Sequence, residues 1–222
     1  MNRTCQVSGC SAPAASGFSP YCSAHRANFR RHGEADQKAV TKTHVKPYLA
    51  LVKARIAKNP HSPAWTTLEA RWRALVDHAE HIIAEYERGR PGSRTERLAA
   101  QEIIKLGRSV EARAVVEMTM AMVVLRELHP HCFRSDRAFW VQLGRRVRGL
   151  TDLNYGERYV HATGKVRRCY RELSPRAGIV FGRWLAETLG VGGMHLARLE
   201  QADHEKQLAE RRDLHDALSK LS

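Results

Sequence analysis

Apolar residues recur along most of this chain at spacings of three and four, which is the period of one face of an α-helix. The pattern begins after Thr41 and predicts a first helix with its apolar face at 45–56. A longer stripe runs unbroken from 65 to 86, and the sequence GRPGS at 89–93 ends it. Ser62, followed by proline, is typical of a helix N-terminus because its hydroxyl can cap free backbone N–H groups. From Thr41 onward the chain is therefore predicted to be mainly α-helical.

The helical pattern continues through the second half of the chain. The segment 95–128 predicts one long central helix with a bend or restart at 107–109. Ser135 can cap a shorter helix at 136–150, and a further helix is predicted over 175–190.

Two stretches have less regular patterns. Glycines interrupt 151–173, where a strand pair is predicted around Tyr159 and Val166. The tail from 194 to 222 is charged, and its leucines form a stripe too irregular for a coiled coil. This tail is predicted to be a helix that packs on a partner chain or projects into water.

The N-terminal region holds three of the five cysteines and a histidine at close spacing. Four residues separate Cys5 from Cys10, and two separate Cys22 from His25. Each spacing lets one turn of chain aim two ligands at one ion, and three thiolates with one imidazole complete a closed tetrahedral zinc shell. The alternatives are a disulfide with one cysteine left over, or three buried thiols that are close by chance. His32 is the nearest substitute ligand.

The segment around these ligands has little apolar surface to bury, so its fold is expected to depend on the metal. Gly9 suits a tight turn beside the first ligand pair. Ser23 can cap a helix that begins at the second pair, and Gly33 can end that helix. A loop followed by a helix start, each carrying two ligands, predicts a treble-clef or ribbon-like zinc finger.

The predicted fold class is mainly α, with a small N-terminal zinc finger followed by an all-α helical domain. The predicted units are the finger at 1–36, the helical domain at 37–192 and a charged C-terminal helix at 193–222. A basic linker at about 34–44 joins the first two.

Charge adds an expectation about partners. The 222 residues include 37 Lys and Arg against 23 Asp and Glu, which leaves a formal net charge of +14. Because this excess is spread along the chain, a nucleic acid is the predicted partner, and DNA is favoured over RNA.

The chain has no apolar run long enough to cross a membrane and no signal peptide at its start, and the odd number of cysteines argues against a disulfide framework. These features predict a protein of the bacterial cytoplasm or nucleoid.

Clusters of positive side chains are the candidates for contacts with phosphates, because each neutralised phosphate releases condensed counterions. The finger helix and the helix at 136–150 carry the strongest of these clusters. The predicted nucleic-acid contacts are Arg26, Arg30, Arg31, His32, Lys42, Lys46, Lys53, Arg145, Arg146, Arg148, Arg167 and Arg168.

The N-terminal pattern also resembles a known module. The spacing Cys-x4-Cys, the sequence Tyr-Cys-x2-His at 21–25 and the sequence RRHG at 30–33 are similar to a small zinc module of bacteriophage and mobile-element proteins, among them HNH-type homing endonucleases. The resemblance covers about the first 36 residues. It implies zinc held by Cys5, Cys10, Cys22 and His25, and association with nucleic acid. The His-Asn-His constellation of the endonucleases is not found downstream.

Candidate catalytic groups do not assemble into a recognisable reaction. His195 and Arg198 match the His-x-x-Arg pair of tyrosine recombinases, but that family needs a later tyrosine, and the last one here is Tyr170. Asp152 and Glu157 could hold a divalent ion, although no spacing singles them out. No catalytic residue is predicted.

The sequence therefore predicts a non-enzymatic, zinc-containing DNA-binding protein of a phage or mobile element, with an accessory or regulatory role in recombination, transposition or gene control. A recombinase, a transposase or a second copy of the chain is the expected protein partner. The alternatives are a metal-dependent DNA endonuclease of unrecognised type and a protein–protein adaptor in a nucleic-acid-containing assembly.

Overall fold

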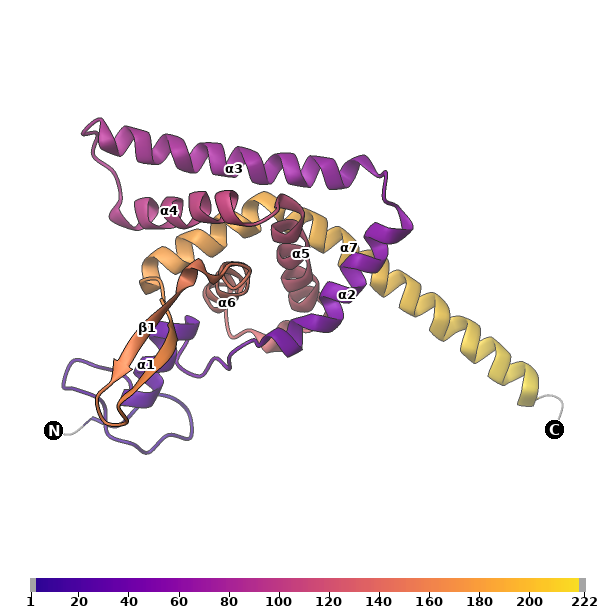
Figure 1. Ribbon diagram of the computed structural model, residues 1–222. Helices are drawn as coiled ribbons and strands as arrows, with labels where there is room; N and C mark the ends of the chain where they lie inside the picture. The colour runs from indigo at the N-terminus through magenta and orange to yellow at the C-terminus, as the bar shows by residue number, and fades with distance from the viewer. Residues whose placement is uncertain (1–2, 220–222) are drawn as a thin grey trace.

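The computed structural model describes residues 3–219, and helices dominate this part of the chain (Figure 1). The helices are α1 (Ser23–His32), α2 (Lys42–Lys58), α3 (Pro63–Glu87), α4 (Arg94–Ser109), α5 (Ala112–Leu128), α6 (Asp136–Arg148) and α7 (Pro175–Ser219). One antiparallel hairpin joins β1 (Tyr155–Val160) to β2 (Lys165–Tyr170). The predicted fold class, mainly α with a small N-terminal module, is confirmed. Residues 1–2 of the predicted finger and 220–222 of the predicted C-terminal helix lie outside the described residues.

Helix α5 is the centre of the core. It packs against α2, α3, α6 and α7, and it is buried from Thr119 through Leu125 without interruption. A helix that is apolar on all sides is stable only when other elements surround it. Helices α2, α3, α6 and α7 each turn an apolar face toward it, and α4 packs its apolar face on α3 and α7, which accounts for the three-and-four spacing in their sequences.

Several helix starts follow the predicted capping chemistry. The Ser62 hydroxyl accepts a hydrogen bond from the Ala64 N–H, and Pro63 occupies the first turn of α3. The Ser135 hydroxyl likewise accepts from the Ala138 N–H at the start of α6. Both caps were predicted, because these side chains act within their own turn of chain.

The segment 95–128, predicted as one long helix with a bend or restart at 107–109, is two helices, so the restart is confirmed but lies at 110–111. The chain leaves helical geometry at Val110, whose backbone is extended, and α5 restarts after Glu111. Gly107 lies inside α4, where it faces α3: a Cβ on Gly107 would lie 2.9 Å from both methyl carbons of Val76. This glycine therefore allows α3 and α4 to approach each other and does not break the helix.

The helix predicted to end at Gly190 instead continues to Ser219, so α7 spans 45 residues and crosses the predicted boundary at 192. Gly182 and Gly193 are points of close contact with neighbouring helices. A Cβ on Gly182 would lie 1.9 Å from the Trp140 carbonyl oxygen of α6, and one on Gly193 would lie 2.6 Å from the Val123 Cβ of α5. Arg55 of α2 pairs with Glu200 and Asp203 further along α7, and beyond these pairs α7 extends away from the other helices (Figure 1).

The irregular stretch at 151–173 forms the predicted strand pair, and Tyr159 lies directly opposite Val166. None of the helices within residues 3–219 combines the length and the apolar character needed to cross a membrane.

Candidate metal centre and arginine groove

Four donor side chains meet near the N-terminus. One ligand atom from each of Cys5, Cys10, Cys22 and His25 lies within 4.8 Å of all the others. The His25 Nδ1 atom is 3.3 Å from the Cys5 sulfur and 3.4 Å from the Cys22 sulfur. All three cysteines are free thiols, so no disulfide joins them. This cluster can hold a metal ion, and it is the one group of its kind within residues 3–219.

The first ligand pair is brought together by a tight loop. Gly9 has a φ of +76°, which places it in the left-handed region where glycine has no steric penalty. The Cys10 N–H donates to the Val7 carbonyl at 3.0 Å, and the Cys5 N–H donates to the Ala12 carbonyl at 2.9 Å. These bonds fold the loop back on itself, so both sulfurs lie on one side of it.

The second ligand pair is placed by the start of α1. Cys22 caps this helix, in place of the predicted Ser23, and its sulfur accepts a hydrogen bond from the His25 N–H at 3.5 Å. Residues three apart at a helix start lie on the same side of the turn, so the sulfur and the imidazole converge.

Within the cluster the pKa values of Cys5 and Cys10 shift in opposite directions. Desolvation raises the pKa of Cys5, but hydrogen bonds from the backbone of Cys22 and Val7, with His25 and Cys10 beside it, lower that pKa to about 6 overall. The Ala12 N–H lowers the pKa of Cys10, whereas desolvation and the neighbouring sulfurs outweigh it and raise that pKa. Three sulfur donors and one imidazole form a soft donor set, which favours zinc over calcium or magnesium.

The finger is fixed to the helical body, and His32 is part of that attachment. The His32 side chain is 7% exposed, and its Nδ1 accepts a hydrogen bond from the buried Gln142 amide of α6 at 2.9 Å. The same Gln142 side chain accepts from the Val40 N–H at 3.0 Å. The sequence predicted an exposed His32 at a nucleic-acid surface. Instead, this side chain joins α1 to α6 in the interior and does not face solvent.

The predicted linker at 34–44 is also packed onto the body. Ala35, Gln37 and Val40 are buried, and the Gln37 amide donates to the Cys132 carbonyl at 3.0 Å. The finger and the helices therefore form a continuous packed structure.

Burial of His32 predicts a pH effect on stability. Desolvation, reinforced by Arg145, Arg31 and Arg146, lowers the pKa of His32 from 6.5 to about 4. Between these values the unfolded chain binds a proton that the folded chain rejects, so His32 contributes stability above about pH 6.5 that is lost as the pH falls toward 4. We expect a loss of about 2 kcal/mol between pH 7 and pH 5 from this residue.

The measurement is urea unfolding of the parent and of His32→Asn at both pH values. The Asn amide oxygen replaces Nδ1 as the acceptor for Gln142 and does not titrate in this range. The variant should lose less stability on acidification than the parent. Equal losses in the two proteins would show that other groups carry the effect.

Arg148 was predicted to contact nucleic acid, but it is 3% exposed and holds the hairpin to the body. Its Nε donates to the Glu102 carboxylate of α4 at 2.8 Å, and its Nη2 donates to the Asn154 side-chain oxygen at 3.0 Å. Its other bonds go to the Arg171 carbonyl and the Tyr170 hydroxyl. Four of its five N–H donors are used inside the protein and the side chain is buried, so Arg148 is not available to a phosphate.

The other predicted contacts lie at or near the surface. Lys42, Lys46, Arg31 and Arg167 are exposed. Three more form ion pairs: Lys53 with Glu117 at 3.8 Å, Arg145 with Glu172 at 2.5 Å, and Arg168 with Asp152 at 2.7 Å. Arg146 is half-buried, and desolvation lowers the pKa of its guanidinium.

Arg26 and Arg30 lie together at a groove between the finger and the body. The groove has a volume of about 890 Å³ and also carries Arg94 of α4, Arg137 of α6 and Arg176 of α7. None of the described residues that line it is acidic. The ion pairs within residues 3–219 include Arg134 with Asp36 and Arg145 with Glu172, but none of these five arginines. Five uncompensated cations around one concave surface favour a polyanion.

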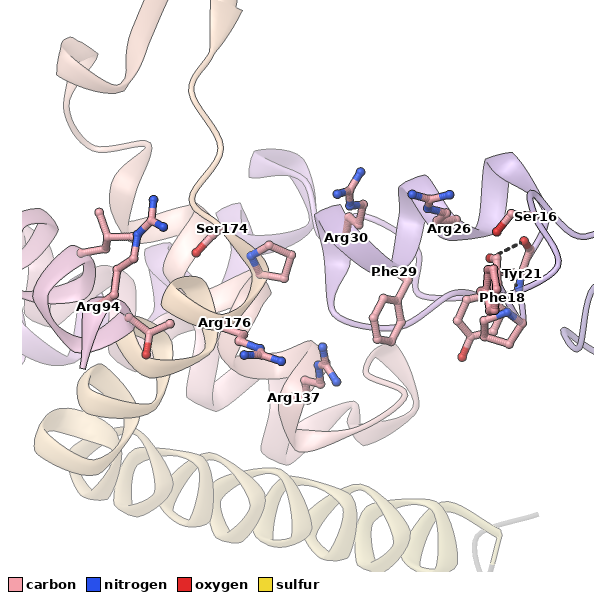
Figure 2. Close-up of a pocket in the computed structure, with 15 residues that line it drawn as sticks. Ser16, Phe18, Tyr21, Arg26, Phe29, Arg30, Arg94, Arg137, Ser174 and Arg176 are labelled. Atoms are coloured by element: carbon pink, nitrogen blue, oxygen red, sulfur yellow. Dashed lines mark hydrogen bonds between the residues drawn. The ribbon is translucent and has the colours of Figure 1, made fainter. Parts of the chain in front are cut away.

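The sequence analysis missed three members of this groove, Arg94, Arg137 and Arg176. They come from three different helices, so no local spacing connects them. In the view of Figure 2 the labelled arginines follow one another from Arg94 to Arg26, and Phe18 and Tyr21 lie at the Arg26 end.

The aromatic side chains of the groove come from the finger. Phe18 is fully exposed, and the Tyr21 and Phe29 ring centroids are 5.5 Å apart. The Arg137 guanidinium lies over the Phe29 ring, 4.5 Å from its centroid. The groove therefore combines cations with aromatic faces.

Comparisons of the chain with protein-family models, with curated proteins and with solved structures found no match.

Proposed function

We propose that this protein is a zinc-containing DNA-binding protein in which the arginine groove contacts the phosphate backbone. The observation that carries the proposal is the set of five arginines, without an acidic neighbour among the described residues, around one groove. Phosphates are the polyanionic partner that such a surface attracts in a cell, and binding is strengthened by release of counterions.

The metal has a structural part in this proposal. Cys5, Cys10, Cys22 and His25 would hold zinc in a closed shell, which leaves no coordination position for a substrate. When bound, zinc joins the N-terminal loop to the start of α1. Arg26 and Arg30 follow within two turns of that start, so their backbone positions are set by the metal-held turn.

The proposed biological role is an accessory or regulatory one in a phage or mobile element, in recombination, transposition or gene control. It is supported by the resemblance of the first 36 residues to the zinc module of such proteins and by the positive net charge. The docking of the finger onto α6 makes one binding surface from both parts of the chain.

Arg26→Ala with Arg30→Ala should weaken DNA binding and flatten its dependence on salt. Both side chains are exposed, so the double variant should fold. Each lost phosphate contact reduces the slope of log K against log salt by about 0.9 on a duplex or about 0.7 on a single strand. Fluorescence anisotropy with labelled duplex and single-stranded DNA at several salt concentrations measures both quantities.

The matched control is Arg211→Ala with Arg212→Ala, which removes the same charge from the exposed end of α7. Unchanged affinity and slope in the groove variant, or equal losses in the two variants, would refute the proposal. Incubation of plasmid with the parent protein and Mg²⁺ tests for cleavage. Intact plasmid is expected for a protein that only binds DNA, and nicked or cut plasmid for an endonuclease.

A further inference from the structure

We infer that the groove takes a single-stranded nucleic-acid segment, with its phosphates on the arginines and a base against the exposed aromatic rings of the finger. This inference rests on the proposed function and names the form of nucleic acid that the groove selects. It depends on the exposed ring of Phe18, on the packed rings of Tyr21 and Phe29, and on the arginines that line the same groove.

Phe18 is the first reason. Its side chain is 101% exposed, although phenylalanine is among the residues most often buried. The turn that carries it is well ordered: the Ser19 N–H donates to the Ser16 carbonyl at 3.1 Å. The buried Ser19 hydroxyl donates to the Tyr21 carbonyl at 2.8 Å and accepts from the Tyr21 N–H at 3.2 Å. A large apolar ring is thus held in water by a hydrogen-bonded turn, and a partner that covers it gains hydrophobic free energy.

The neighbouring rings are the second reason. Tyr21 and Phe29 pack at an angle of 36°, and the Arg137 guanidinium lies over Phe29. The Arg137 Nε is buried and has no hydrogen-bond partner within the described residues. Aromatic rings beside arginines are the chemistry that stacks bases and holds the phosphates between them. The aromatic end and the positive walls belong to the same groove (Figure 2).

The need for free base faces decides between a single strand and a duplex. In a duplex, stacked neighbours cover both faces of each base, so a protein ring has no face to contact. In a single strand the faces are free, and stacking is available to every base type. The groove volume of about 890 Å³ lies within the roughly 300–1,000 Å³ of small-molecule pockets. It suits a few nucleotides of one strand and is too small to enclose a duplex.

The position of the cations gives the path of the strand. Arg26 and Arg30 are four residues apart on α1 and extend from the same side of that helix, whereas Phe29 extends from its other side, toward Arg137 of α6 and Arg176 of α7 (Figure 2). A backbone laid along the groove meets these cations in succession and brings a base to Phe18 at the end formed by the finger loop.

The experiment measures anisotropy of labelled probes with the full-length protein. The probes are oligothymidine, oligouridine, a duplex of equal length and an abasic deoxyribose-phosphate strand of equal length. We expect the single strand to bind at least roughly ten-fold more tightly than the duplex and than the abasic strand. Comparison of oligothymidine with oligouridine shows whether the groove prefers single-stranded DNA or single-stranded RNA.

Phe18→Ala should weaken oligothymidine binding roughly ten-fold and leave the abasic strand unaffected, since only stacking is lost. Leu214→Ala, which truncates an exposed apolar side chain on the far part of α7, is the control and should change neither. Because Phe18 is fully exposed, its truncation should leave the fold intact, and zinc content with thermal unfolding verifies this.

Two results would overturn the inference. If Phe18→Ala leaves oligothymidine affinity unchanged while Arg26→Ala with Arg30→Ala weakens every probe, the groove binds phosphates without stacking, and the proposed function stands alone. Tighter binding of the duplex than of the single strand would overturn the inference in the same way. If no probe binds the parent protein, the proposed function fails together with the inference.

Discussion

We expect Cys22→Ser to abolish metal binding and to unfold the finger, which would be the largest effect of any single substitution in this protein. The serine hydroxyl can still cap α1 by accepting from the His25 N–H, so the variant removes a metal ligand and spares the cap. A finger of this size has too little buried apolar surface to fold without its metal. Loss of one ligand from a four-ligand shell should weaken zinc affinity by at least roughly 100-fold.

Elemental analysis of the purified parent and variant measures the metal, and limited proteolysis of the N-terminal region measures the folding of the finger. The parent should carry equimolar zinc, and chelation of that zinc should reproduce the behaviour of the variant. Cys169→Ser is the matched control, since this thiol lies in the hairpin and outside the cluster. A parent free of stoichiometric metal, or a variant with full zinc content, would contradict the prediction.

Arg148→Met should destabilise the helical body by about 3 kcal/mol, near the lower end for removal of one member of a buried ion pair. The substitution leaves the Glu102 carboxylate and the Asn154 side chain without their main donor. Lys105 still lies 2.5 Å from Glu102, which limits the cost. Thermal unfolding followed by circular dichroism should show a decrease in Tm of roughly 10 °C.

Arg168→Met tests whether this cost comes from burial. Arg168 also pairs with a carboxylate, Asp152, but both side chains are exposed, so its loss should change stability by less than about 1 kcal/mol. Similar decreases in Tm for the two variants would show that Arg148 is not a buried anchor of the hairpin. Arg148→Met is also expected to leave DNA affinity at low temperature close to that of the parent, because its side chain does not reach the groove.

Features that depend on nearby residues were predictable from the sequence. Ser62 and Ser135 cap helices within their own turns, Gly33 ends α1 with a φ of +92°, and Tyr159 pairs with Val166 across a short hairpin. The four metal donors belong with these features, because each pair is brought together by a single turn of chain. In all of these cases, the interacting groups are separated by only a few bonds of backbone whose geometry is known.

Predictions failed where a residue's role depends on what packs against it. Gly190 resembles a helix stop in sequence, yet α7 passes through it because neighbouring helices stabilise the helix on both sides. His32 and Arg148 were predicted to be exposed because their neighbours are charged. Their hydrogen bonds to Gln142 and to Glu102 come from other elements and make both side chains internal.

The sequence by itself determined the helical class of this protein, most of its helix starts, the turn at Gly9 and the set of residues that can hold a metal, because these follow from periodicity and short-range geometry. The tertiary structure decided which cations are exposed and which of them share a surface. Arg26, Arg94 and Arg176 come from three helices spread over the whole chain, and only the packing of those helices brings their charges around one groove. Electrostatic attraction depends on distance in space, and the sequence does not contain that distance.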